Sequence, residues 1–122
     1  MADWQLGDIE VTSVLEQMAE FMTLEKFFDG FTPEMFDAHK DWLLPNAVSP
    51  TSGKMILPIQ SYLVRTKHHT ILIDTCVGCH KKFKWVPDWN DRRDDTYLRN
   101  LKAAGVDPTE IDYVFCTHLH VD

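Results

Sequence analysis

The 122-residue sequence lacks the features that mark several classes of protein. Its first residues, MADWQLGDIEV, contain no basic segment followed by an apolar run, so no secretory signal peptide is visible. No stretch approaches the roughly 18 apolar residues that a membrane-spanning helix needs. Lysine and arginine number only 12, against 19 aspartates and glutamates, and form no long basic run. We therefore expect neither a membrane nor a nucleic acid as a partner, since phosphate binding needs a basic surface.

Cysteine is scarce as well, and its three residues are an odd number. An odd count without an export signal favours a reduced, cytoplasmic protein over a disulfide-bonded one. The remaining composition is that of an ordinary globular domain, with 44% hydrophobic and 25% charged residues. The length fits one domain or part of one.

Two of the cysteines lie in the segment CVGCH at residues 76–80, whose spacing is used for covalent attachment of c-type haem. Such haem is normally attached outside the cytoplasm, which argues against it here. A structural zinc held by Cys76, Cys79 and His80 is an alternative, but it lacks the second ligand pair of a zinc finger. The third cysteine, Cys116, is expected to be a small buried side chain within a strand.

The pattern of apolar residues, caps and turn residues predicts strands interspersed with helices. One helix begins with Thr32 as N-cap and Pro33 at its first position, and it ends before Pro45. In chain order we expect a strand over 7–15, an irregular connection over 14–31 with a short helix at 24–28, the helix just described, a hairpin of strands over 55–65 and 71–74, a polar loop over 80–95, a helix over 95–104, a capped turn at 107–110 and a buried strand over 111–117. This order predicts an α/β fold with a mixed sheet.

Some side chains can be assigned to the interior or the surface from the same patterns. His39 lies on the apolar stripe of its helix, and we interpret it as a packed core or rim histidine. His68 and His69 lie at the tip of the hairpin and are expected to be solvated. The helix over 95–104 is expected to bury Tyr97, Leu98, Leu101 and Ala104.

The last six residues, THLHVD, carry the strongest candidate site. His118, His120 and Asp122 alternate with Leu119 and Val121, and in an extended segment alternate residues share one side. We therefore expect two imidazoles and a carboxylate to converge while the two apolar residues point into the core. Imidazole nitrogen and carboxylate oxygen suit zinc and related divalent ions. The end of a strand is also where α/β sheets usually place their chemistry.

THLHVD resembles the H-x-H-x-D-H signature of the metallo-β-lactamase fold superfamily and lacks only its final histidine. The hairpin YLVR…ILIDTCVG is similar to the strand pair of that family that ends in an aspartate, a threonine and a glycine, here Asp74, Thr75 and Gly78. The helix LRNLKAAGV and the following DPTEIDYVFCTHLHVD resemble the family's approach to its metals. The stretch DWNDRRDDTYLRNLKAAGVDP looks closest to the branch of lactonases and organophosphate hydrolases. The resemblance covers nearly the whole chain from Gly7 onward.

The resemblance implies an αββα sandwich with a mixed sheet and flanking helices, of which this chain would be the N-terminal half. His118 and His120 would ligate a first zinc, and Asp122 would ligate a second zinc or accept a proton from the metal-bound water. The residues that would support the site without holding the metal are Asp74, Thr75, Gly78 and Thr117. The implied activity is hydrolysis of a lactone or another small-molecule ester, with one or two Zn²⁺ ions or other divalent metals activating the water.

The sequence stops at Asp122, before the histidine that completes the signature. We therefore expect residues 1–122 to form a single partial domain, truncated inside the motif and inactive alone, whose bared sheet face favours a homodimer. The alternatives are a non-catalytic metal-binding or interaction module and, less favoured, a c-type haem protein that uses residues 76–80. The Phe- and Met-rich segment 18–36 is a candidate hydrophobic wall for the substrate, although ordinary core is the favoured interpretation.

Overall fold

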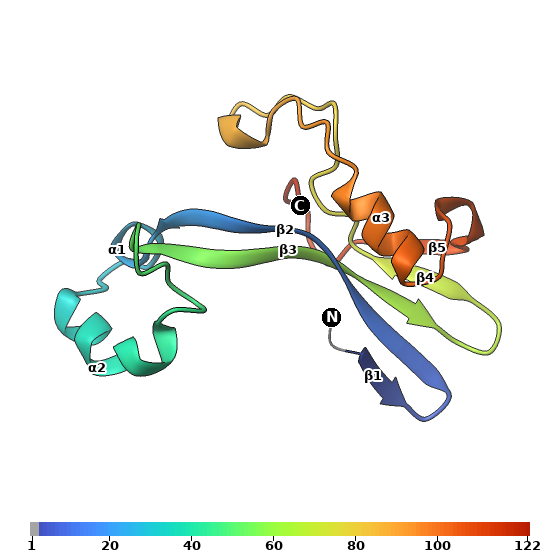
Figure 1. Ribbon diagram of the computed structural model, residues 1–122, viewed down its shortest axis with the longest axis horizontal. Coiled ribbons are helices and arrows are strands. Elements are labelled where there is room, and N and C mark those ends of the chain that lie inside the picture. The colour runs from blue at the N-terminus through green and yellow to red at the C-terminus, as the bar shows by residue number, and fades with distance from the viewer. Residues whose placement is uncertain (1–2) are drawn as a thin grey trace. The chain divides into compact units, whose positions relative to one another are not determined.

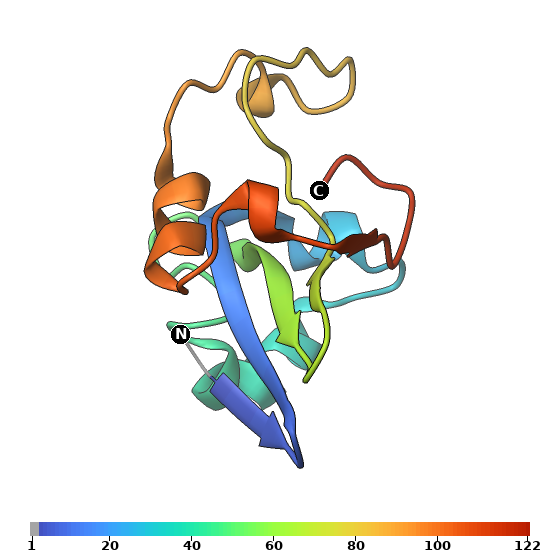
Figure 2. The ribbon, with the colours of Figure 1, turned by 90° about the vertical axis from the view of Figure 1, so that its right-hand side faces the viewer.

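A computed structural model describes residues 3–122 as a set of strands and short helices (Figures 1 and 2). Met1 and Ala2, which belong to the expected domain of residues 1–122, lie outside the described residues. The elements in chain order are β1 (Asp3–Leu6), β2 (Ile9–Thr23), α1 (Leu24–Phe27), α2 (Pro33–Leu43), β3 (Lys54–Arg65), β4 (Thr70–Ile73), a 3₁₀ turn (Pro87–Trp89), α3 (Thr96–Ala103), a second 3₁₀ turn (Pro108–Glu110) and β5 (Tyr113–Phe115). Within residues 3–122, no helix has the length and apolar character that crossing a membrane requires.

The strands form one sheet in the order β1-β2-β3-β4-β5. Strands β1 and β2 are antiparallel, as are β3 and β4, whereas β4 and β5 are parallel. The predicted α/β fold with a mixed sheet is therefore confirmed. The predicted hairpin is confirmed too, since Arg65 of β3 pairs with Thr70 of β4. His68 and His69 are exposed at its tip, as expected.

The chain divides into two compact units, and the first contains the candidate site; it consists of the residues up to Gln17 and those from Ile59 onward. Its core joins the sheet to α3, because side chains from β2, β3 and β4 pack against that helix and the residues after it. The buried apolar residues of this core are Val14, Leu63, Leu72, Leu101 and Val106. This core fixes the strand ends on which the site is built.

Helix α3 confirms the helix predicted over 95–104 and corrects its inward face. Leu101 is 1% exposed and Tyr97 packs against the core, but Leu98 is 55% exposed. The expectation that Leu98 points inward is therefore wrong. Successive residues of a helix are about 100° apart, and the core contacts only the narrow stripe through Tyr97, Leu101 and Ala104, so that Leu98 falls outside it. Gly105, with φ at +80°, ends the helix in the left-handed conformation that glycine tolerates.

Leu101→Ala is expected to lower the free energy of unfolding by about 2–5 kcal/mol, because it removes a fully buried side chain and leaves a cavity. Leu98→Ala in the same helix is the matched control and is expected to change it by less than about 0.5 kcal/mol. Urea unfolding followed by circular dichroism measures both. Equal losses in the two variants would contradict the assignment of the helix face.

The second unit, residues 18–58, contains α1 and α2 (Figure 1). Helix α2 begins as predicted, because the Thr32 hydroxyl accepts a hydrogen bond from the Met35 N–H at 3.3 Å. The irregular connection predicted over 14–31 is wrong in its first part, since β2 continues to Thr23; sheet pairing decides the conformation there, and the local sequence has no clean period. His39 is exposed and its ring lies against Trp42, so of the expected core or rim position the core position is wrong.

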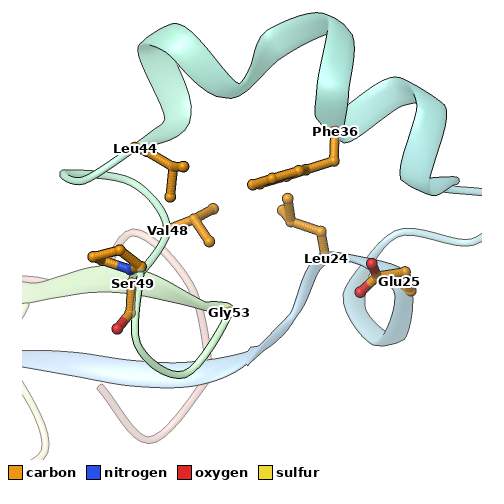
Figure 3. Close-up of a pocket in the computed structure, with 8 residues that line it drawn as sticks. Leu24, Glu25, Phe36, Leu44, Val48, Ser49 and Gly53 are labelled. Carbon is orange, nitrogen blue, oxygen red and sulfur yellow. The ribbon is translucent and has the colours of Figure 1, made fainter.

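A cavity of about 310 Å³ lies within this second unit (Figure 3). Side chains of Leu24, Phe36, Leu44 and Val48 face one another around it, and Glu25 is the charged residue of its lining. The segment 18–36 thus serves partly as core and partly as cavity wall. Its role as a wall for substrate stays a prediction.

Candidate metal centre

The candidate site follows the ends of two neighbouring parallel strands. Ile73 of β4 pairs with Phe115 of β5, and the Asp74 N–H donates to the Phe115 carbonyl oxygen at 2.8 Å. Parallel strands end at the same edge of a sheet, so the residues that follow β4 and β5 meet there. Strand β5 itself is exposed, with 57% of Tyr113 and 60% of Phe115 accessible, and Cys116 is exposed as well. The expected burial of residues 111–117 and of Cys116 is therefore wrong: β5 is an edge strand, which apolar composition alone does not indicate.

Asp74 fixes the segment that follows β5. One carboxylate oxygen accepts the Thr117 N–H at 2.8 Å, and the other accepts the Thr117 hydroxyl at 2.7 Å. The hydroxyl bond from Thr117 is the main reason that the pKa of Asp74 lies below its ordinary value. The carboxylate therefore stays ionised at neutral pH and holds both polar groups of Thr117 at once.

Thr117 in turn orients the ring of the first histidine and selects its tautomer. Its hydroxyl oxygen lies 3.0 Å from Nδ1 of His118. A hydroxyl has one proton, and here that proton is donated to the ionised Asp74. The hydroxyl must therefore accept a hydrogen bond from Nδ1–H of His118, which leaves Nε2 of the neutral ring with a free lone pair. A histidine ligand is oriented in this way in most metal sites.

His118, His120 and Asp122 converge, as the sequence predicted. One ligand atom of each lies within 4.8 Å of the other two, and Nε2 of His118 is 3.6 Å from a carboxylate oxygen of Asp122. Ligand atoms about 2.1 Å from a tetrahedral zinc lie roughly 3.4 Å apart, so small side-chain movements would bring the three to bonding distance. Two imidazoles and a carboxylate are a donor set that suits zinc. The three residues therefore fit a divalent ion by chemistry and by spacing.

The route to this convergence differs from the one expected. Residues 117–120 are bent and do not continue as an extended strand. Leu119 is 97% exposed and Val121 is 36% exposed, so the expectation that both point into the core is wrong. The bend is stabilised from outside the segment, by the Asp74 carboxylate on Thr117. Alternation in the sequence predicted correctly that the three side chains converge, but a bent segment brings them together and not an extended strand.

A buried ion pair missed by the sequence analysis supports the turn after β4. Glu16 of β2 is 3% exposed, and its carboxylate oxygens accept the N–H groups of Val77 at 3.1 Å and Gly78 at 2.8 Å. Nη1 of Arg92 lies 2.9 Å from the same carboxylate. The one available signal was a glutamate two residues after Val14, on the face of the strand that enters the core. Gly78 has φ at +74°, which agrees with its expected role in backbone geometry.

The two cysteines of the C-x-x-C-H segment have separate surroundings. Cys76 is buried, with its sulfur 3.3 Å from the hydroxyl oxygen of Ser61, whereas the Cys79 thiol donates to the Asp94 carbonyl oxygen at 3.0 Å. Within residues 3–122, three metal-ligating side chains lie close enough to share an ion at one place, formed by His118, His120 and Asp122. Cys76, Cys79 and His80 do not form such a group. This geometry does not favour a structural zinc there. Haem attachment would require the buried thiol to leave the core.

The buried thiol leads to a labelling prediction. Burial raises the pKa of Cys76 to about 12, so at pH 8 only about one molecule in 10⁴ carries the reactive thiolate. Iodoacetamide at pH 8 is therefore expected to modify the exposed Cys116 at least 100-fold faster than Cys76, as measured by peptide mass spectrometry. In 6 M guanidinium chloride both are expected to react alike. Equal rates in the folded chain would contradict the burial of Cys76.

Comparison with known proteins agrees with this arrangement. The sequence model of the metallo-beta-lactamase superfamily matches residues 56–122, which include most of β3, all of β4 and β5, and the candidate site. The chain belongs to the metallo-beta-lactamase superfamily. The resemblance stated from the residues of the hairpin and of THLHVD is thereby confirmed. A comparison with curated proteins gave no match.

Solved structures with the same fold include hydrolases. The chain is similar to the hydrolase AbOPH of the beta-lactamase superfamily, with 25% identity and a TM-score of 0.71 over 98% of this chain and 36% of that one. A probable metal-dependent hydrolase from Staphylococcus aureus matches with 20% identity and a TM-score of 0.71, over 98% of this chain and 40% of that chain. AidC, a dizinc quorum-quenching lactonase in complex with a product, matches with 23% identity and a TM-score of 0.68, over 99% of this chain and 36% of that chain. The chain thus spans 36–40% of the length of these relatives.

Proposed function

We propose that this protein is a metal-dependent hydrolase that cleaves a lactone or another small-molecule ester, and that His118, His120 and Asp122 hold its divalent ion, with zinc the expected metal. The observation that carries the proposal is the convergence of these three side chains within 4.8 Å at the end of two parallel strands. Membership of the metallo-beta-lactamase superfamily supports the reaction class. The similarity to the lactonase AidC supports the substrate class.

Each residue has a distinct part in this proposal. Nε2 of His118, which carries the lone pair in the tautomer that the hydrogen bond at Nδ1 favours, would bind the ion together with His120. Asp122 would supply an oxygen ligand or accept the proton of the attacking water. A divalent ion held by these residues would lower the pKa of its bound water to about 7 and would stabilise negative charge on the ester oxygen. Asp74 and Thr117 keep His118 in the orientation and tautomer that metal binding needs.

The first test of the proposal is binding of zinc to the metal-free chain. Isothermal titration calorimetry is expected to show one ion per chain, with binding lost when His118 and His120 are both changed to alanine. A stoichiometric ion that survives this double change would contradict the site. The control is a double change of the exposed His68 and His69, which is expected to leave binding intact.

The second test is hydrolysis, assayed with the protein at its natural length because the chain spans 36–40% of its solved relatives. The substrates are N-acyl homoserine lactones, simple lactones, aryl esters, a β-lactam and a phosphotriester. Zinc-dependent opening of lactones is expected to be the fastest reaction. Zinc binding without turnover on any of these substrates would indicate the alternative, a non-catalytic metal-binding module.

A further inference from the structure

We propose that Glu16 is a positioning residue for the metal-binding segment 117–122, an inference that rests on the proposed function of that segment. Glu16 lies in β2, more than 100 residues before the candidate ligands, and has no contact with them in the described part of the chain. Its effect passes through the turn after β4 to Asp74, and from Asp74 to Thr117 and His118. Each of these steps rests on hydrogen bonds or ion pairs between named groups.

The first step is the burial of the Glu16 charge. Glu16 lies two residues after Val14 on the buried face of β2, where an apolar residue is usual. The carboxylate of Glu16 is 3% exposed, and a buried charge is costly unless it is paired and hydrogen-bonded. The Val77 and Gly78 N–H groups and the Arg92 guanidinium meet both requirements. Arg92 is itself fixed by Asp94, to which its other terminal nitrogen donates at 2.8 Å. A leucine could fill this space in the core, but only a carboxylate can accept the Val77 and Gly78 N–H groups and pair with Arg92.

The second step is the conformation of the turn that Glu16 holds. Asp74 and Cys76 have φ at 57° and 59°, in the left-handed region that side chains other than glycine disfavour, and Gly78 has φ at 74°. Such residues persist only where the surroundings over-determine them. Consecutive N–H groups of such turns form a concave site for an anion. The Glu16 carboxylate occupies the N–H groups of Val77 and Gly78 and so stabilises the strained form.

The third step links the turn to the candidate ligands. Asp74 is the first left-handed residue of the turn, and both of its carboxylate oxygens are used by Thr117, at 2.8 and 2.7 Å. Catalytic and metal-binding groups have to be held within about 0.5 Å of their productive positions. If the turn relaxes, Asp74 moves, and His118 loses the hydrogen bond that orients its ring. Glu16 therefore acts on the candidate metal ligands through the turn after β4.

The experiment compares Glu16→Gln with Glu10→Gln, both in the metal-free chain and with zinc. Glutamine keeps the size of the side chain but replaces one of the two acceptor oxygens with NH₂, so the Val77 and Gly78 N–H groups no longer each have an acceptor oxygen, and the negative charge that pairs with Arg92 is lost. Glu10 is the matched control because it lies in the same strand and pairs with Arg65 at 3.4 Å, away from the turn. The metal-free measurements are hydrogen exchange of the Thr117 amide and the ¹⁵N shifts of the His118 ring. The zinc affinity is measured by calorimetry.

In Glu16→Gln we expect at least 10-fold faster exchange at Thr117, loss of the single Nδ1–H tautomer of His118 and at least 10-fold weaker zinc binding. Glu10→Gln is expected to match the unmodified chain in all three. A folded Glu16→Gln chain with unchanged Thr117 exchange and an unchanged His118 tautomer overturns the inference. If the unmodified chain binds no zinc, the proposed function fails, while the two metal-free measurements still decide the role of Glu16.

A second variant covers the case in which Glu16→Gln does not fold. Glu16→Asp keeps the buried negative charge but withdraws the carboxylate by one methylene from its partners, the Val77 and Gly78 N–H groups and the Arg92 guanidinium. It is expected to change the Thr117 exchange and the His118 ring in the same direction. A folded Glu16→Asp chain that matches the unmodified one in both measurements overturns the inference.

Discussion

His120→Ala is expected to weaken zinc binding more than 100-fold and to abolish zinc-dependent ester hydrolysis. Loss of a residue that only supports a ligand typically costs 10–100-fold in metal affinity, and His120 is proposed as a ligand itself, one of three whose donor atoms lie within 4.8 Å of one another. A factor of 100 corresponds to about 2.7 kcal/mol of binding free energy. Calorimetry and a lactone assay measure the two effects.

The fold is expected to tolerate this change. His120 is exposed, so the free energy of unfolding of the metal-free chain is expected to change by less than about 0.5 kcal/mol. His39→Ala is the matched control, because His39 is an exposed histidine of α2 that lies against Trp42. It is expected to leave zinc affinity unchanged. Full retention of zinc affinity in His120→Ala would remove His120 from the site.

Asp74→Asn is expected to weaken zinc binding 10–100-fold, although Asp74 is not proposed as a ligand. The asparagine has one acceptor oxygen, and Thr117 presents two donors to it. Its NH₂ group forces the Thr117 hydroxyl to accept, so this hydroxyl then donates to Nδ1 of His118. The proton of the neutral ring moves to Nε2, the nitrogen that is proposed to bind the ion. A change of aspartate to asparagine produces a wrong tautomer in the same way in serine proteases.

The measurement is ¹⁵N NMR of the His118 ring in the metal-free chain, together with calorimetry. The expected result is a switch from the Nδ1–H to the Nε2–H tautomer in Asp74→Asn. Asp112→Asn is the matched control, because Asp112 accepts the Thr70 N–H at 2.8 Å beside the same strand pair, and its histidine partner is His69 rather than His118. An unchanged tautomer in Asp74→Asn would show that the Thr117 hydroxyl does not set the tautomer of His118.

Acid is expected to weaken the same hydrogen bonds between Asp74 and Thr117. Because the pKa of Asp74 is lowered in the folded chain, mainly by the Thr117 hydroxyl, its ionised form contributes stability above the ordinary aspartate pKa of about 3.9. This contribution is lost as the pH falls through the lower pKa of the folded state. We therefore expect protection of the Thr117 amide in the metal-free chain to persist at pH 5 and to disappear only below about pH 4.

Local signals account for the parts of the fold that the sequence predicted well. The Thr32 cap with Pro33 predicts the start of α2, and the alternating run over 55–65 with the turn before residue 71 predicts the β3–β4 hairpin. In both cases the determining contacts are between neighbours in the chain, such as the Thr32 hydroxyl with the Met35 N–H. Predictions that depended on distant packing were wrong more often. Leu98, Leu119 and Cys116 are apolar and were expected inside, yet all three are exposed.

By itself, the sequence determined the chemistry of the candidate site, since only the identity of the side chains makes His118, His120 and Asp122 a donor set for a divalent ion. Only the tertiary structure decided how they meet. Asp74, 43 residues before Thr117, bends the segment and orients His118, and Glu16 holds the turn that carries Asp74. These are contacts between residues far apart in the chain, formed by the pairing of β4 with β5 and the packing of β2, and no local pattern in the sequence encodes them.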